Sequence, residues 1–193
     1  MVAPRDDVAR DATLPDLLRP GLAIVFVGIN PSLYSVERGH YFARPTSRFW
    51  PAFSRSRLSA AARRALGAAT LGPANDIDLP AHGFGFTDVV KRATAKASEL
   101  RPGELEAAAP ELLGKLARMK PRIACFHGVT GFRPFHLVVF PRARHKPTLG
   151  LQTERIGETQ LFVVPSPSGA NAHASLAGQV AWYDRLAELL GLP

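Results

Sequence analysis

The most restrictive feature of this sequence is the run Leu22-Ala23-Ile24-Val25-Phe26-Val27, which is apolar throughout and rich in β-branched residues. A run without alternating polar positions is typical of a central parallel strand that is buried on both faces. Gly28 and Pro31 then end this strand in a loop. Because both faces of such a strand must be covered, the sequence predicts a sheet between two layers of helices.

Further segments repeat the pattern of buried strands and amphipathic helices. Strands are expected at Arg122 to Phe126 and at Gln160 to Val164, both of which are apolar runs. Helices are expected over about Pro102 to Met119 and about Leu176 to Leu190, where apolar residues recur at helical spacing. Strands that alternate with helices in this way favour a mostly parallel sheet.

The expected fold class is therefore α/β, a three-layer sandwich with a central, mostly parallel sheet flanked by helices. Ser47 to Arg64 is expected to be helical in parts, with an interruption around Pro51. The 193 residues are expected to form one domain, 1–193, with residues 1–19 as a peripheral N-terminal arm. In such sheets ligands bind beyond the carboxyl ends of the strands, so the loops after the first and last apolar runs are candidate sites.

The distribution of charge favours an anionic partner. The chain has 24 Lys and Arg residues against 16 Asp and Glu residues, a formal net charge of +8. No acid lies between Glu37 and Asp76 or between Glu111 and Glu154, and both stretches carry several arginines. Two basic stretches of this kind suit a phosphate backbone, so nucleic acid is the expected partner. The alternative is a solvated basic surface without a ligand.

Several classes of function are not expected because their sequence signatures are missing. No apolar run approaches the roughly 20 residues that a bilayer requires, and residues 1–10 have no apolar signal core, so no membrane partner and a cytoplasmic location are expected. Cys125 is the single cysteine and lies in an apolar run, where a buried, inert thiol is expected. The six histidines are scattered without metal-ligand spacing, and no phosphate-binding glycine loop is present, so neither a metal nor a cofactor is expected.

One loop carries a side chain suited to catalysis. Gly28-Ile29-Asn30-Pro31-Ser32 follows the first apolar run, and Pro31 restricts Asn30 to an extended backbone. An asparagine at the end of a strand can donate to a carbonyl and accept from a water, so it can orient a nucleophile without being one. Gly28 allows the close approach of a ligand. Taken by itself, however, this segment is better explained as an Asn-Pro turn.

The residues downstream extend this loop into the longer motif Gly39-His40-Tyr41-Phe42-Ala43-Arg44-Pro45-Thr46-Ser47-Arg48-Phe49-Trp50. Together the two segments resemble the mismatch-specific uracil-DNA and thymine-DNA glycosylases of the uracil-DNA glycosylase superfamily. Pro165 to Asn171 resembles the second motif of that family, and Gly85 to Arg92 resembles a further family segment. The similarity spans about Pro20 to Leu190, and it implies a uracil-DNA glycosylase-like fold that excises bases from DNA.

The resemblance implies roles for the residues of a base-binding pocket. Asn30 matches the asparagine that positions the attacking water, and Phe42 matches the aromatic ring on which the flipped base stacks. The backbone amides of Ile29 and Phe42 would face the base carbonyl, as an anionic leaving group requires. Ser35 matches a pocket hydroxyl, and Gly28 completes the expected pocket.

The resemblance also implies a surface that binds DNA. The second motif matches the loop that enters the duplex and fills the gap left by the extruded nucleotide. The residues of this loop are Ser168, Gly169, Ala170 and Asn171. Ala170 is smaller than the leucine that some bacterial relatives use as a wedge. Arg44 and Arg48 are expected to contact phosphates.

Two interpretations of Asp88 remain open. Thr87-Asp88 has the composition of a helix cap, since Asp is a good N-cap residue. The functional alternative is that the carboxylate activates water as a general base or stabilises the sugar cation. Some bacterial relatives have lysine at this position. An ionised group beside a base pocket is costly to keep without a task, which favours the catalytic interpretation.

The expected function is that of a monofunctional glycosylase that removes uracil, and in the wider case thymine or modified pyrimidines, mispaired with guanine in double-stranded DNA. It is expected to act as a monomer. No helix-hairpin-helix element with a catalytic lysine is visible, which excludes strand cleavage by that route. One alternative is a non-catalytic DNA-binding module of the same fold. Another is an unrelated nucleotide hydrolase, although neither a phosphate loop nor a metal cluster is present to support it.

Overall fold

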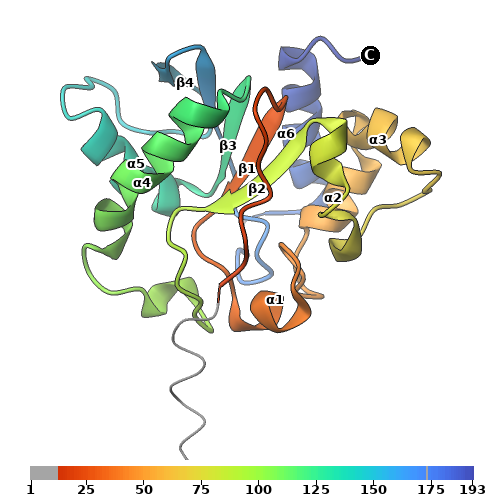
Figure 1. Ribbon diagram of the computed structural model, residues 1–193, viewed down its shortest axis with the longest axis horizontal. Coiled ribbons are helices and arrows are strands. Elements are labelled where there is room, and N and C mark those ends of the chain that lie inside the picture. Colours follow the sequence, from red (N-terminus) through yellow and green to blue (C-terminus); the bar gives the residue numbers. More distant parts are fainter. Residues whose placement is uncertain (1–12, 173) are drawn as a thin grey trace, which may run out of the picture.

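A five-stranded sheet in the order β2-β1-β3-β5-β4 forms the middle layer of this computed structural model, which describes residues 13–172 and 174–193 (Figure 1). Pairs β1–β2, β1–β3 and β3–β5 are parallel, whereas β4 runs antiparallel to β5 at one edge. The strands are β1 (Ile24–Gly28), β2 (Phe84–Asp88), β3 (Ile123–His127), β4 (Gly150–Ile156) and β5 (Thr159–Val164).

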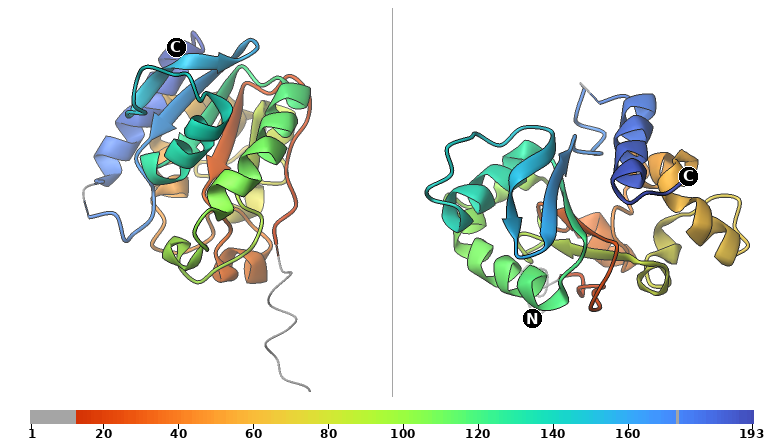
Figure 2. Two further views of the ribbon diagram at one scale, coloured as in Figure 1. Left: turned by 90° about the vertical axis from the view of Figure 1, so that its left-hand side faces the viewer. Right: turned by 90° about the horizontal axis from the view of Figure 1, so that it is seen from above.

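Helices cover both faces of the sheet, as the view from above in Figure 2 shows. They are α1 (Leu33–Arg38), α2 (Phe49–Arg55), α3 (Ala60–Ala65), α4 (Glu104–Met119), α5 (Val129–Val139) and α6 (Leu176–Leu189). Short 3-10 helices span Arg57–Ser59, Pro73–Asn75, Leu79–His82 and Ala97–Glu99. Helices α4 and α5 lie against one face, and α2 and α6 lie against the other.

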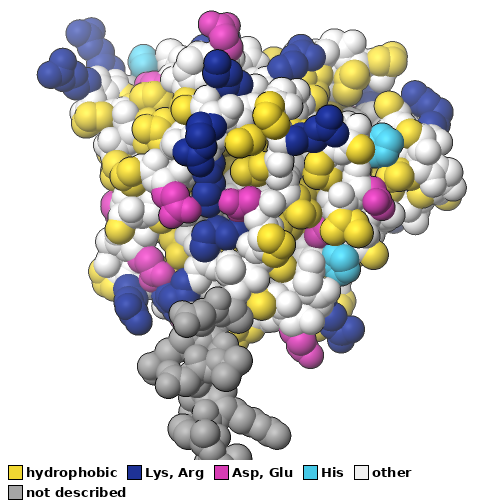
Figure 3. All heavy atoms as spheres, in the orientation of Figure 1, with side chains coloured by type: hydrophobic (Ala, Val, Ile, Leu, Met, Phe, Trp, Pro, Cys, Tyr) yellow, Lys and Arg dark blue, Asp and Glu magenta, His cyan; other side chains and the backbone are white. Residues whose placement is uncertain are grey.

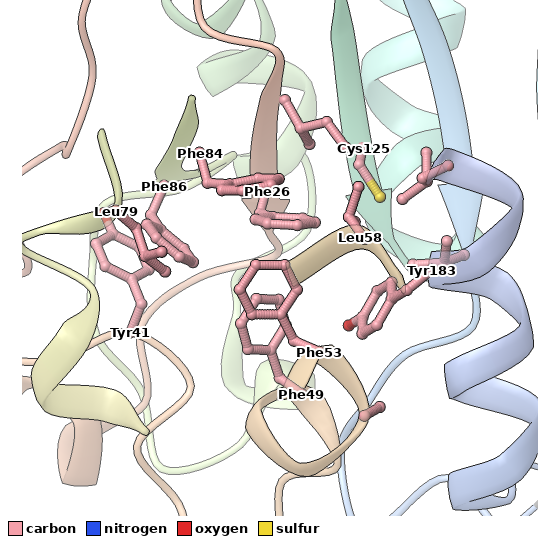
Figure 4. Packing of buried hydrophobic residues seen from close by; sticks show 14 of the residues in the cluster. Phe26, Tyr41, Phe49, Phe53, Leu58, Leu79, Phe84, Phe86, Cys125 and Tyr183 are labelled. Carbon is pink, nitrogen blue, oxygen red and sulfur yellow. The ribbon is translucent and has the colours of Figure 1, made fainter. Parts of the chain in front are cut away.

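The alternation of side chains along β1 divides the core into two halves. Ile24 and Phe26 point to the side of α2 and α6, where they join an aromatic cluster. Val25 and Val27 point to the side of α4 and α5. Figure 4 shows Phe26 among the rings of the aromatic cluster, with Tyr183 reaching it from α6. A strand buried on both faces is what the continuous apolar run requires.

The predicted fold class is confirmed, and most of the predicted elements are present close to their expected bounds. The expected interruption at Pro51 is wrong, because Pro51 lies in the first turn of α2, where a missing N–H costs no hydrogen bond. Helix α5 and strand β4 were not expected. Cys125 is fully buried as predicted, and burial raises the pKa of its thiol.

The segment before β1 packs more closely than a peripheral arm would. Residues 1–12 of the expected arm lie outside the described residues, but Leu14 is 2% exposed and belongs to the core. Leu17 pairs with Phe86 at the free edge of β2. Within the described ranges, no helix is long and apolar enough to cross a membrane.

On the face seen in Figure 3, Lys and Arg side chains form a column in the middle with Asp and Glu beside it, and further Lys and Arg side chains lie along the upper edge. The carboxyl ends of the parallel strands lie at the lower edge of the molecule in Figure 1, close to α1 and the loop that follows β5. The loops expected to carry the chemistry therefore meet at one edge of the sheet.

Candidate active site

A cavity of about 1100 Å³ lies at the carboxyl ends of the parallel strands. Its wall combines Asp88 at the end of β2 and His127 at the end of β3 with residues of four loops. These loops lie within 28–32, 41–47, 94–98 and 165–171. Of the site residues expected from the sequence, only Arg48 does not line the cavity.

The side-chain amide of Asn30 is held in one orientation. Its Nδ2 donates to the hydroxyl of Thr94 at 2.7 Å, to the carbonyl of Arg92 at 3.0 Å and to the carbonyl of Pro31 at 3.3 Å. The Thr94 hydroxyl in turn donates to the carbonyl of Lys96 at 2.8 Å. Since Nδ2 is engaged, Oδ1 is the atom that can accept a hydrogen bond from a water molecule. Sequence analysis did not single out Thr94, because its contact with Asn30 spans 64 residues.

Asp88 is a buried carboxylate on the same wall. It is 4% exposed, and its Oδ2 has no hydrogen-bond partner within the described residues. Burial raises the pKa of Asp88 to about 7, with a further increase from Asp16, while Lys91 and Lys115 oppose the shift. A group that titrates near neutral pH can exchange a proton with water or substrate.

The alternative in which Asp88 caps a helix is wrong. Asp88 is the last residue of strand β2 and pairs with Gly28 of β1. The next residue, Val89, donates its amide to the carbonyl of Gly28 at 2.9 Å, so the chain continues beside β1 instead of turning into a helix.

A network of charges lies behind Asp88 and was not expected. Asp16 accepts from the hydroxyl of Thr87 at 2.7 Å and from the ammonium groups of Lys91 and Lys115, both at 2.8 Å. These bonds lower the pKa of Asp16, although burial alone would raise it. The network fixes two positive charges near Asp88 and keeps the segment before β1 on the sheet.

Phe42 provides the aromatic wall of the cavity. Its ring stacks on Phe49 with 4.2 Å between centroids and 10° between planes, and it lies 4.9 Å from the ring of His127. The backbone of Phe42 has a φ of +54°, in the left-handed region that residues with a side chain rarely adopt. Strain of this kind is typical of functional positions.

Hydrogen-bond donors remain available on the backbone of the cavity wall. In the described part of the chain, the amides of Ile29 and Phe42 donate to no acceptor. Ser35 is buried, and its hydroxyl accepts from the hydroxyl of Ser32 at 3.0 Å and from the amide of Ala43 at 3.3 Å. Ser35 therefore ties α1 to the segment that follows Phe42.

The guanidinium groups of Arg44 and Arg48 contact loop carbonyls. Arg44 Nη2 donates to the carbonyl of Ala95 at 2.7 Å. Arg48 Nη1 donates to the carbonyl of Ser168 at 2.8 Å and to that of Asn171 at 3.3 Å. Each arginine thus joins the segment that carries Phe42 to a neighbouring loop of the cavity.

The loop after β5 has its own internal hydrogen bonds. The side chain of Asn171 donates to the carbonyl of Ser166 at 3.0 Å, and the amide of Ala170 donates to the hydroxyl of Ser168 at 3.3 Å. Ser168, Gly169 and Ala170 are exposed at its tip. The loop is therefore ordered at its base and presents small residues outward.

His127 is a site residue that sequence analysis missed. It is 3% exposed, and its Nε2 lies 3.0 Å from the hydroxyl of Tyr183. Burial lowers the pKa of His127 to about 3, against a small opposing effect of the Val27 backbone, so the ring is neutral at physiological pH. It directly follows the apolar run Arg122 to Phe126, and that position was the signal that could have found it.

The geometry defines an α/β protein with a cavity at the carboxyl edge of its sheet, whose wall carries the oriented amide of Asn30 and the buried carboxylate of Asp88. Over residues 15–189 the chain matches the Uracil DNA glycosylase superfamily. This chain therefore belongs to the uracil DNA glycosylase superfamily. Among the described residues, no group of three or more His, Cys, Asp or Glu could hold a metal ion.

Two similar proteins agree with this membership. A G/U mismatch-specific uracil DNA glycosylase of Schizosaccharomyces pombe is 31% identical over 161 residues, which cover 82% of this chain and 48% of that protein. The chain thus spans about half the length of this curated relative. A candidate uracil DNA glycosylase of Methanosarcina acetivorans, solved by NMR, has a TM-score of 0.55 and 21% identity, and the match covers 91% of this chain and 98% of that chain.

Proposed function

We propose that this protein is a monofunctional DNA glycosylase that flips uracil out of double-stranded DNA and hydrolyses its N-glycosidic bond, with a preference for uracil opposite guanine. Family membership and the activity for which the S. pombe relative is named support this proposal. The enzyme acts without a cofactor, as a monomer in the cytoplasm.

The observation that carries the proposal is the presence of Asn30 and Asp88 on one cavity wall. Asn30 has an amide whose nitrogen is engaged and whose oxygen can hold a water molecule. Asp88 is a buried carboxylate whose pKa of about 7 suits a proton acceptor at neutral pH. One side chain orients the nucleophile and the other takes its proton.

The reaction is the attack of that water on the sugar carbon C1′ as the bond from C1′ to the base nitrogen breaks. The bonding electron pair leaves with the base, and its negative charge spreads onto the base carbonyl. The amides of Ile29 and Phe42 stabilise this charge as donors. The proton of the water passes to Asp88, and the products are a free base and an abasic sugar.

The flipped base stacks on Phe42, with Gly28 allowing it to approach the end of β1 and Ser35 offering a hydroxyl at the pocket. The tip of the loop Ser168–Asn171 enters the duplex and fills the vacated space. Arg44 lies beside this surface and carries a charge that attracts phosphates. Ala170 is small, so it fills the gap loosely.

The test is excision from a duplex that contains one uracil opposite guanine, measured in single turnover and developed with hot alkali. Wild-type enzyme is expected to form an abasic site, and Asn30→Ala to slow this step by about 10² or more, as expected when a reactant loses its positioning. Asp88→Asn is expected to slow it by about 10²–10⁴, the usual contribution of an acid–base group.

Parallel duplexes with uracil opposite adenine and with thymine opposite guanine define the mismatch preference and the range of bases. Tight binding without abasic sites would leave a DNA-binding module of the same fold and refute the enzyme. Strand cleavage before alkali would refute a monofunctional mechanism.

A further inference from the structure

Arg48, Phe49 and Trp50 contact two separate parts of the cavity wall. The contacts of Arg48 to the loop after β5 include its backbone as well as its side chain, since its amide donates to the carbonyl of Pro167 at 2.8 Å. Its Nη1 adds the bonds to the carbonyls of Ser168 and Asn171. One residue therefore contacts this loop at three carbonyls.

The next two residues hold the segment that carries the base-stacking ring. Phe49 is fully buried and stacks against Phe42 at 4.2 Å. Trp50 is 4% exposed, and its Nε1 donates to the carbonyl of Tyr41 at 2.9 Å. In Figure 4 the ring of Phe49 points from α2 into the aromatic cluster beneath β1. These buried rings make α2 a fixed support from which Arg48 extends.

A second contact brings the same two segments together. A Cβ on Gly169 would lie 2.8 Å from the Cβ of Thr46 and 3.0 Å from its carbonyl oxygen. The tip of the loop therefore rests directly on the segment between Phe42 and Arg48. Arg48 binds the loop through hydrogen bonds, and Thr46 blocks the loop tip at Gly169 from moving closer to the segment that carries Phe42.

We propose that Arg48 is a positioning residue, which sets the loop Pro165–Asn171 at a fixed distance from the ring of Phe42 and does so through hydrogen bonds rather than through a phosphate contact. This inference rests on the proposed function, in which the loop fills the gap while the base stacks on Phe42. Arg48 and Phe49 are consecutive residues at the start of α2. The same helix therefore positions both the loop that fills the gap and the ring on which the base stacks.

The chemistry of the side chain supports this assignment. Arginine presents a planar set of donors that can bind two carbonyls from one nitrogen, whereas lysine is a point charge with a different reach. Within the described residues Arg48 forms no ion pair, and it does not line the cavity. Both loop carbonyls accept from the single Nη1 of Arg48, an arrangement that the shorter lysine ammonium does not reproduce.

The experiment compares Arg48→Lys, Arg48→Met and the control Arg55→Met, which removes an exposed arginine from the other end of α2. Single-turnover excision at saturating enzyme is expected to fall about 10- to 100-fold in both Arg48 variants, in line with the cost of small misplacements. Arg55→Met is expected to keep the wild-type rate. The salt dependence of duplex binding is expected to keep the wild-type slope in Arg48→Met.

Hydrogen exchange of the free protein gives a readout that does not require activity. The amides within 165–171 are expected to exchange faster in both Arg48 variants than in wild type or Arg55→Met. Gly169→Ala disturbs the contact between the loop tip and Thr46 without changing any charge. It is expected to slow excision and to leave the salt dependence of duplex binding unchanged.

Three results would overturn the proposal. A wild-type excision rate in Arg48→Lys would mean that charge alone is sufficient. A salt slope that is shallower by about 0.9 in Arg48→Met would reveal a phosphate contact. Unchanged exchange within 165–171 would remove the structural role. If the wild-type protein excises no base at all, the proposed function fails, while the exchange and salt measurements still decide the role of Arg48.

Discussion

The carboxylate of Asp88 fills the place beside Gly28 that any larger side chain would need. A Cβ at position 28 would overlap Oδ1 of Asp88, because the two residues are partners in the β1–β2 register. Gly28→Ala should therefore displace the carboxylate, lower the free energy of unfolding by about 1–3 kcal/mol and slow excision more than tenfold.

Urea unfolding of Gly28→Ala in two backgrounds checks this relationship. In an Asp88→Ala background the space is empty, so the added methyl group should cost little. An equal penalty in both backgrounds would show that Gly28 is required for some reason other than Asp88.

The rate of excision should depend on the ionisation of Asp88. Since burial raises the pKa of Asp88 to about 7, the carboxylate that accepts a proton forms only as the pH approaches that value. The single-turnover rate should rise with pH up to about 7 and then level off, and this rise should be absent in Asp88→Asn. A wild-type profile that stays flat from pH 5 to 8 would remove the base role.

The free energy of unfolding should also depend on the ionisation of Asp88, but it should fall with rising pH where the rate of excision rises. The pKa of Asp88 in the folded protein, about 7, lies above that of an unfolded aspartate, so the folded state binds the proton more tightly. Relative to Asp88→Asn, the free energy of unfolding should be highest below about pH 4 and fall as the pH rises to about 7. Urea titrations of both proteins over this range measure the difference, which should amount to a few kcal/mol.

Thr94 should matter for catalysis through its bond to Asn30. Thr94→Val removes the acceptor of the 2.7 Å hydrogen bond, whereas Thr94→Ser retains the hydroxyl. Excision should fall about tenfold or more in the valine variant, the cost of a nucleophile held less firmly, and recover in the serine variant. Duplex affinity, measured by titration, should stay unchanged in both. A valine variant with the wild-type rate would mean that Asn30 needs no support from this side chain.

Tyr183 should contribute to stability through His127. Tyr183→Phe leaves Nε2 of a buried, neutral imidazole without its partner at 3.0 Å, which should cost about 1–3 kcal/mol. Tyr34→Phe is a matched control, since Tyr34 is only partly buried and should change stability by less than about 0.5 kcal/mol. Equal effects of the two substitutions in thermal unfolding would contradict a role for the Tyr183 hydroxyl.

The sequence was sufficient for the elements whose burial pattern is strong. The apolar run of β1 and the stripe of α4 predicted that the first is a strand and the second a helix, because burial on two faces or on one leaves a recognisable pattern. Strand β4 alternates between half-buried and exposed residues at the sheet edge, and α5 contains Gly131 and Pro134, so neither has a clear pattern.

The candidate site was predictable where it follows a strand and hidden where it depends on distant contacts. Asn30 lies in the loop directly after β1 and Asp88 ends β2, and the parallel topology brings such residues together. The partners Thr94 and Asp16 could not be inferred, since no local pattern records which side chains meet across 60 or more residues. For the same reason Arg48 was expected to meet a phosphate, while its nearest acceptors are carbonyls of its own chain.

The left-handed backbone of Phe42 places backbone strain and the proposed binding of the base at the same residue. A residue with a Cβ loses about 1–2 kcal/mol in that conformation, and glycine would relieve this strain but lose the stacking on Phe49. A redesign that removes backbone strain alone would therefore replace the ring on which the base is proposed to stack, together with its packing against Phe49. Variants obtained in that way should keep the fold and lose the ability to bind the flipped base. Phenylalanine is therefore best kept at position 42 in any redesign.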